Sequence, residues 1–143
     1  MTTTVQTIFD QAIHLMDEQN EGSGATDTAD TLEYKVRTIS ILNTAIPRLY
    51  PFSSNYDTTA TGRPKSTPLV RNDYRNPDFT QVIQLDDDLC LALLPFYLAA
   101  QLLSGENEEL SAWFMAQYRE AYNILSDKNP GEFKPIPTPY GLF

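Results

Sequence analysis

Cysteine and histidine are almost missing from this sequence, and their scarcity excludes several kinds of site. Cys90 is the only cysteine and His14 the only histidine among 143 residues. One cysteine cannot form a disulfide within a single chain, and one residue of each type cannot supply a zinc site built from cysteine and histidine. We expect Cys90 to be a small buried residue and His14 to be partly exposed or packed at a helix edge.

Long hydrophobic runs are also absent. The longest, residues 89–100, is far shorter than the roughly 20 residues that a membrane-spanning helix needs. The opening residues, MTTTVQTIFDQ, have neither the basic start nor the apolar stretch of a signal peptide. The sequence therefore predicts a soluble protein with no export signal and no membrane partner.

Positive charge is scarce overall and unevenly placed. The formal net charge is -9, and residues 1–33 contain seven acidic residues but no lysine or arginine. Residues 34–75 contain seven basic residues and two acidic ones. This balance argues against a protein whose main role is binding nucleic acid, which requires a basic surface. Opposite charges on two parts of a chain can orient copies or partners, although a solvated acidic face is the simpler interpretation.

Apolar residues recur at helical spacing in the N-terminal third, which predicts two helices. The first covers residues 4–19, with Thr3 or Thr4 as its N-cap. The second begins at a capping box, Asp30-Thr31-Leu32-Glu33. It is expected to end or kink near Ala45, because Pro47 cannot donate a backbone hydrogen bond.

The densest apolar stretch, residues 86–125, predicts two further helices packed as an antiparallel hairpin. Asp86, Asp87 and Asp88 open the first of these helices. One of them can cap it, and all three favour its positive end, while Pro95 predicts a kink within it. Gly105 is the expected left-handed terminator, and Asn107 the cap of the next helix. Aromatic residues at helical spacing in the last helix are interpreted as core: Trp113, Tyr118 and Tyr122.

The segment between the second and third helices, residues 51–85, is expected to be a long irregular loop. Residues 51–82 have no helical periodicity, and loops of this length are usually functional or disordered. Residues 79–85 alternate in polarity and are compatible with a short β-hairpin with residues 68–73. Four basic residues of the loop are candidates for contact with a protein interface or with DNA in a channel: Arg63, Lys65, Arg71 and Arg75.

The C-terminal segment, residues 127–143, combines four prolines with several large apolar residues. Proline favours an extended chain, and a purely solvated tail rarely holds so many apolar groups. We therefore divide the chain into an all-α domain of four main helices, residues 1–126, and an extended docking tail, residues 127–143. The residues expected to contact a partner protein are Phe133, Ile136, Pro137, Tyr140, Leu142 and Phe143.

Groupings that would support catalysis are weak. Asp86, Asp87 and Asp88 could bind Mg²⁺ or Ca²⁺, but consecutive helical residues point about 100° apart and do not converge on one ion. Helix capping explains them better. The sequence has no glycine-rich phosphate loop and no recognisable Ser/His/Asp set. We expect a protein that is not an enzyme and holds neither a cofactor nor a metal.

The order of parts resembles the head–tail connector proteins of long-tailed bacteriophages, which are also called adaptor or head-completion proteins. Two N-terminal helices and a long loop precede an Ala-Leu-rich helix containing Leu98-Ala99-Ala100-Gln101-Leu102-Leu103. A Gly-Glu-Asn turn follows, and then a helix with the rhythm Trp113-Phe114-x-x-x-Tyr118-x-x-x-Tyr122. The layout covers most of the chain, and the residue pattern covers about residues 86–125.

This resemblance implies a structural virion protein, made in the host cytoplasm, that forms a homo-oligomeric ring at the portal vertex. Such a ring joins the DNA-filled head to the neck or tail and extends the DNA channel. Double-stranded DNA then passes through without sequence recognition. The tail would reach the portal protein, and the loop would contact adjacent protomers, the channel or a downstream neck or tail protein.

Two other interpretations stay open. A small helical adaptor or regulator could bind a protein partner through its C-terminal tail without any connection to virions. A metal-dependent enzyme that uses the acidic cluster at residues 86–88 is a third interpretation.

Overall fold

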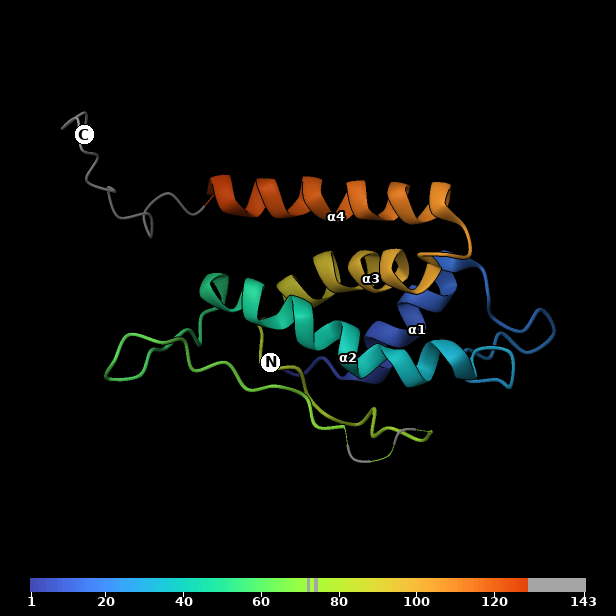
Figure 1. Cartoon of the computed structure of the whole chain (residues 1–143), viewed down its shortest axis with the longest axis horizontal. Helices are drawn as coiled ribbons and strands as arrows, with labels where there is room; N and C mark the ends of the chain where they lie inside the picture. Colours follow the sequence, from blue (N-terminus) through green and yellow to red (C-terminus); the bar gives the residue numbers. More distant parts are fainter. Residues whose placement is uncertain (72, 74, 129–143) are drawn as a thin grey trace.

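A computed structural model describes residues 1–71, 73 and 75–128, and within this part the protein is all-α (Figure 1). It has four α-helices and one short 3-10 helix and no β-strand, which confirms the predicted helical bundle. The helices are α1 (Val5–Met16), α2 (Leu32–Leu49), η1 (Tyr50–Phe52), α3 (Asp87–Leu103) and α4 (Glu108–Lys128).

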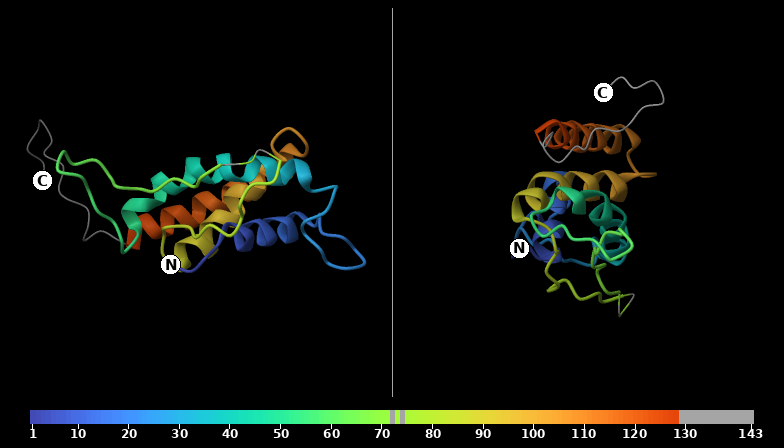
Figure 2. Two further views of the ribbon diagram at one scale, coloured as in Figure 1. Left: turned by 90° about the horizontal axis from the view of Figure 1, so that it is seen from below. Right: turned by 90° about the vertical axis from the view of Figure 1, so that its left-hand side faces the viewer.

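Helix α3 is the centre of the fold. It packs against α1, α2 and α4, whereas α1 and α2 have little contact with each other. Helix α4 runs antiparallel along one side of α3, and α1 and α2 lie on its other side (Figure 2). Because α3 is enclosed in this way, its side chains are buried around most of its circumference, including Cys90, Leu94 and Leu98.

Helix α1 is capped as predicted but ends earlier. The hydroxyl of Thr4 accepts a hydrogen bond from the N–H of Thr7 at 3.3 Å. The helix stops at Met16 rather than Gln19 because Asp17 adopts a left-handed conformation with φ of 59°. The N–H groups of Asp17 and Glu18 then bond back to carbonyls of the last turn, which is the usual way such an end is closed.

The start of α2 differs from the prediction. Thr31 stands at the N-cap position, and the predicted capping box does not form, since no side chain caps this end. The Thr31 hydroxyl instead donates to the carbonyl of Thr26 at 2.7 Å and so organises the preceding loop.

Helix α2 does not end near Ala45, which was one of the two outcomes expected from Pro47. The helix continues to Leu49, and the N–H of Tyr50 still bonds to the carbonyl of Ile46. Pro47 lies close to the helix end, so the backbone N–H that proline lacks removes only one of the last hydrogen bonds of the helix. Burial of Ile46, Leu49 and Tyr50 holds the last turn in place. Pro95 likewise lies inside α3, which continues to Leu103.

The predicted hairpin between residues 68–73 and 79–85 is not formed. Val82 instead forms an isolated antiparallel bridge with Thr4, supported by hydrogen bonds from Val5 N–H to Gln81 and from Ile83 N–H to Thr3. The alternation itself was read correctly, because the side chains of Phe79, Ile83 and Leu85 are buried. The segment predicted as the other strand, residues 68–73, is held by the side-chain amide of Gln81. This amide accepts from the N–H of Val70 at 2.7 Å and donates to the carbonyl of Val70 at 2.8 Å.

The acidic residues at the start of α3 do not act as side-chain caps of that helix, contrary to the prediction. Asp86 accepts hydrogen bonds from the N–H and the hydroxyl of Ser54, at 2.9 and 2.6 Å. Asp87 accepts from the N–H and the hydroxyl of both Thr2 and Thr3. These carboxylates therefore tether two distant segments that pass the helix start, while still favouring its positive end.

The connection between α3 and α4 agrees with the prediction. Gly105 has a φ of 93°, a left-handed conformation that glycine adopts without steric cost. The side chain of Asn107 accepts from the N–H of Leu110 at 3.1 Å and caps α4. Helix α4 then extends to Lys128, beyond the predicted domain boundary at residue 126.

Candidate functional site

Two of the predicted loop residues lie on a projecting turn, residues 57–65. Thr58 and Pro64 form an isolated antiparallel bridge, and the N–H of Lys65 bonds to the carbonyl of Asp57 at 2.9 Å. The side chain of Lys65 pairs with Asp57 at 3.1 Å. The turn extends away from the helices at one end of the long axis (Figure 1), and both Arg63 and Lys65 are exposed.

The other two predicted basic residues lie elsewhere. The guanidinium of Arg71 donates to the hydroxyl of Ser40 on α2 at 2.9 Å. Arg75 belongs to a turn in which its N–H bonds to the carboxylate of Asp73. The four bases therefore do not form one patch, and only Arg63 and Lys65 share a projecting surface.

At the opposite end of the long axis, the loop after α1 approaches the turn between α3 and α4 (Figure 1), and Glu18, Glu33 and Glu106 lie close enough to Tyr34 for their charges to act on it. The hydroxyl of Tyr34 donates to Glu106 at 2.6 Å and so joins the start of α2 to that turn. Burial, this hydrogen bond and the charges of Glu106, Glu18 and Glu33 raise the pKa of Tyr34 well above its usual range. The phenol therefore stays protonated and acts as a donor among carboxylates.

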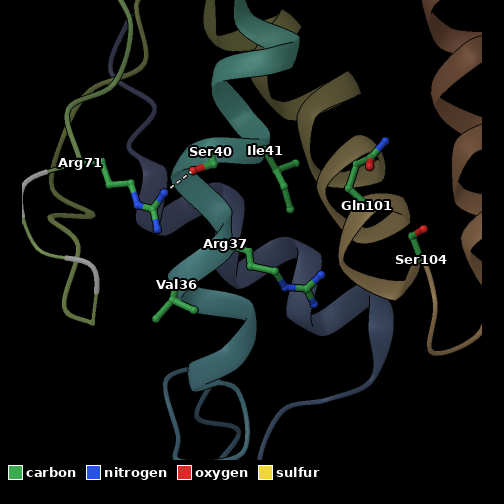
Figure 3. Close-up of a pocket in the computed structure, with 7 residues that line it drawn as sticks. All are labelled: Val36, Arg37, Ser40, Ile41, Arg71, Gln101 and Ser104. Atoms are coloured by element: carbon green, nitrogen blue, oxygen red, sulfur yellow. Dashed lines mark hydrogen bonds between the residues drawn. The ribbon is translucent and has the colours of Figure 1, made fainter.

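A polar hollow lies between α2 and α3 (Figure 3), with a volume of about 360 Å³. One guanidinium nitrogen of Arg37 donates to the carbonyl of Leu102 at 3.1 Å, and so gives a hydrogen-bond partner to one of the last carbonyls of α3, which have none within the helix. The other arginine, Arg71, points at Ser40. The residues described around this hollow include no carboxylate, histidine or cysteine, so they offer no acid–base pair: Val36, Arg37, Ser40, Ile41, Arg71, Gln101 and Ser104.

The outer part of α4 carries exposed apolar residues. Trp113 is 54% exposed, so its predicted place in the core is wrong, whereas Tyr118 is buried as predicted and Tyr122 is half-buried against Phe52. Helix α4 packs chiefly on α3, and a single neighbouring helix covers only one face of α4, so Trp113 on another face stays exposed. A sequence pattern shows that a helix has an apolar face but not how much of it a neighbour covers.

Two apolar hollows adjoin α4. One, of about 560 Å³, lies near the start of the helix, where Leu15, Leu110, Trp113 and Phe114 are rimmed by Asn107 and Glu109. The other, of about 290 Å³, lies near its end, between α4 and the start of α3. Asp88 is the one charged residue in that second lining, which is otherwise apolar: Leu89, Ala92, Leu93, Ala121, Ile124 and Leu125.

Reactive side chains in the described residues stand apart from one another. Cys90 is buried, as predicted, and burial raises the pKa of its thiol to about 12. His14 is exposed on α1. The described ranges contain no group of three or more His, Cys, Asp or Glu residues arranged to hold a metal ion. The predicted tail contacts Phe133, Ile136, Pro137, Tyr140, Leu142 and Phe143 lie outside the described residues.

Comparison with family models, with curated proteins and with solved structures finds no match to this chain. Across the helices that the structure describes, none is both long enough and apolar enough to span a bilayer.

Proposed function

We propose that this protein is a structural virion component that forms a ring at the portal vertex and joins the DNA-filled head to the tail or neck. Its role is assembly rather than catalysis. The four-helix layout with a long loop between α2 and α3 is what the resemblance to head–tail connectors implies, and it is compatible with the described fold.

The observation that carries the proposal is the polarity of the molecule along its long axis. The projecting turn, with Arg63 and the Lys65–Asp57 ion pair, is at one end, and Glu18, Glu33 and Glu106 lie near Tyr34 at the other, where Glu33 is 3.9 Å from Arg37. Two different, complementary surfaces on one chain favour head-to-tail contact between copies. Such contacts produce a closed ring when the rotation between copies is suitable.

The remaining surfaces fit the other contacts of a connector. The C-terminal tail is the proposed contact with the portal protein, and the loop between α2 and α3 meets a neighbouring protomer or a downstream neck or tail protein. A net charge of -9 suits a channel through which DNA must slide without adhering.

Electron microscopy of the protein in assembled particles tests this proposal. We expect copies in a closed ring around a channel, located between the portal and the tail. A chain shortened to residues 1–129 should leave DNA-filled heads that fail to join tails. Particles that assemble normally without this protein would refute the proposal.

A second candidate is a small helical adaptor that binds a protein partner outside any virion. The exposed apolar hollow at Trp113 favours it, since exposed aromatic residues are common at the centre of protein interfaces. The same microscopy separates the two candidates, because an adaptor of this kind forms no ring around a channel.

A further inference from the structure

The two apolar hollows lie on one face of α4. Ile124 follows Trp113 by eleven residues, which turns an α-helix about 1100° and brings the side chains to within about 20° of the same direction. The same interval separates Leu110 from Ala121 and Phe114 from Leu125, the other α4 residues of the two linings. A single elongated ligand laid along α4 would therefore meet both hollows.

The C-terminal segment of the same chain starts beside this face. Helix α4 ends at Lys128, about 6 Å along the axis from Ile124. The next residues, Asn129-Pro130-Gly131, form a sequence typical of a turn, which reverses the chain direction. Fifteen residues, 129–143, follow the helix, and about 3 Å per residue gives them a reach that exceeds the length of α4.

The spacing of the apolar residues in this segment matches the spacing of the hollows. Phe133 and Tyr140 are seven residues apart, or about 22 Å in an extended proline-rich chain. Ile124 and Leu110 are fourteen residues apart on α4, or about 21 Å along the helix axis. Phe133 at the hollow of Ile124 would place Tyr140 at the hollow of Leu110 and Trp113.

Charge does not select this register, because Glu132 precedes Phe133 and Lys134 follows it, with Asp88 in the hollow beside Ile124. Proline-rich segments bind apolar and aromatic grooves with little loss of conformational entropy, because their extended form is already favoured.

From this geometry we infer that the α4 face is a docking groove for the protein's own C-terminal segment, with Phe133 against Ile124 and Tyr140 in the hollow formed by Leu110 and Trp113. The short connection keeps the segment at a high effective concentration near the groove. A partner that takes up the tail must then draw it away from α4, and it uncovers Trp113 in doing so. The inference goes beyond the connector proposal and holds whether or not the protein forms a ring.

Trp113 is the only tryptophan, so its fluorescence reports on the groove directly. The test measures quenching by acrylamide in the full-length chain, in the variant F133S/Y140S and in the control K134S/T138S. We expect F133S/Y140S to raise the quenching constant about twofold, because Tyr140 no longer covers the exposed part of the indole. The control should change it little. A groove variant, Ile124→Ser, should also raise the quenching constant, and it should keep the fold because the Ile124 side chain is 49% exposed.

Dilution identifies the occupant. Protection by the chain's own segment is independent of protein concentration, whereas protection by a second copy is lost on dilution. Equal quenching constants in the full-length chain and F133S/Y140S would overturn the inference. A constant that rises on dilution of the full-length chain would overturn it too, since the groove would then hold the tail of another copy.

Discussion

Asp87 holds Thr3 by two hydrogen bonds, from the N–H at 2.9 Å and from the hydroxyl at 2.7 Å, although 84 residues separate them. Thr2 adds two more hydrogen bonds to the same carboxylate. The start of the chain is thereby fixed to the start of α3. The carbonyl of Thr3 also accepts from Ile83, so three segments meet at one point.

Asp87→Asn should destabilise the fold. The amide keeps the shape of the carboxylate but loses its charge, and one of its two acceptor atoms becomes a donor facing other donors. We expect a lower urea midpoint with an unchanged slope, measured by circular dichroism. Asp88→Asn is the matched control, because Asp88 is exposed at the same helix end. Equal midpoints for the two variants would contradict the assigned role.

Stability should fall in acid. Hydrogen bonds from the Thr3 hydroxyl and the Thr2 N–H hold the pKa of Asp87 well below its usual range, and hydrogen bonds from Ser54 lower the pKa of Asp86. A carboxyl whose folded pKa is depressed stabilises the fold above its unfolded pKa of about 4 and loses that contribution as the pH falls further. Urea titrations from pH 6 to pH 2 should show this loss, and Asp87→Asn should flatten it.

Tyr34→Phe should cost about 1 kcal/mol of unfolding free energy, because it removes the hydrogen bond to Glu106 while leaving the ring in place. The raised pKa of Tyr34 predicts a further effect at alkaline pH. Its stabilising contribution is complete below the unfolded pKa of about 10 and is lost as the pH rises toward the folded value. Urea unfolding at pH 7 and pH 11 checks both effects, and the variant should be the less pH-sensitive protein.

Arg63→Glu should weaken association between copies if the projecting turn meets the acidic end of a neighbour. Arg75→Glu is the matched control, since it makes the same charge change at an exposed position outside that turn. Sedimentation at low and high salt measures the effect, and salt should weaken the wild-type association as well. Identical association of both variants would show that the turn is not part of the contact.

The Cys90 thiol should react very slowly with Ellman's reagent in the folded protein and at once in denaturant. Burial shields it, and its pKa of about 12 leaves almost no thiolate at neutral pH. The reaction is followed by absorbance at pH 8. Rapid reaction in the absence of denaturant would show that α3 opens locally far more often than its burial indicates.

Local signals predicted much of this fold from the sequence. Gly105 and Asn107 mark the turn between α3 and α4 because the left-handed conformation and the cap are properties of those residues. The alternation of Phe79, Ile83 and Leu85 correctly identified a segment with one buried side. It did not identify the partner of that segment, Thr3 to Gln6, because pairing across the chain depends on the path of the loop.

Long-range contacts account for what the sequence did not reveal. Asp86 and Asp87 match the pattern of helix caps, and only the positions of Ser54 and Thr2 show that they serve other donors. Trp113 is exposed because no further helix packs on the outer side of α4, and the apolar pattern of one helix does not show how many neighbours that helix has. The grouping of the loop bases was not readable either, because the path of the loop places Arg63 and Lys65 on the projecting turn and Arg71 and Arg75 elsewhere.

The one-sided attachment of α4 gives the molecule an order of unfolding. Helix α4 packs chiefly on α3, with a further contact of Tyr122 on Phe52, so its release loses fewer apolar contacts than release of α3, which packs against three helices. Amide protons of α4 should therefore exchange through a partial opening, at a free energy below that of global unfolding, while those of α3 report the whole fold. Release of α4 about the turn at Gly105 would swing its C-terminal end by as much as the helix length, about 30 Å, and would uncover the face of α3 on which it packs.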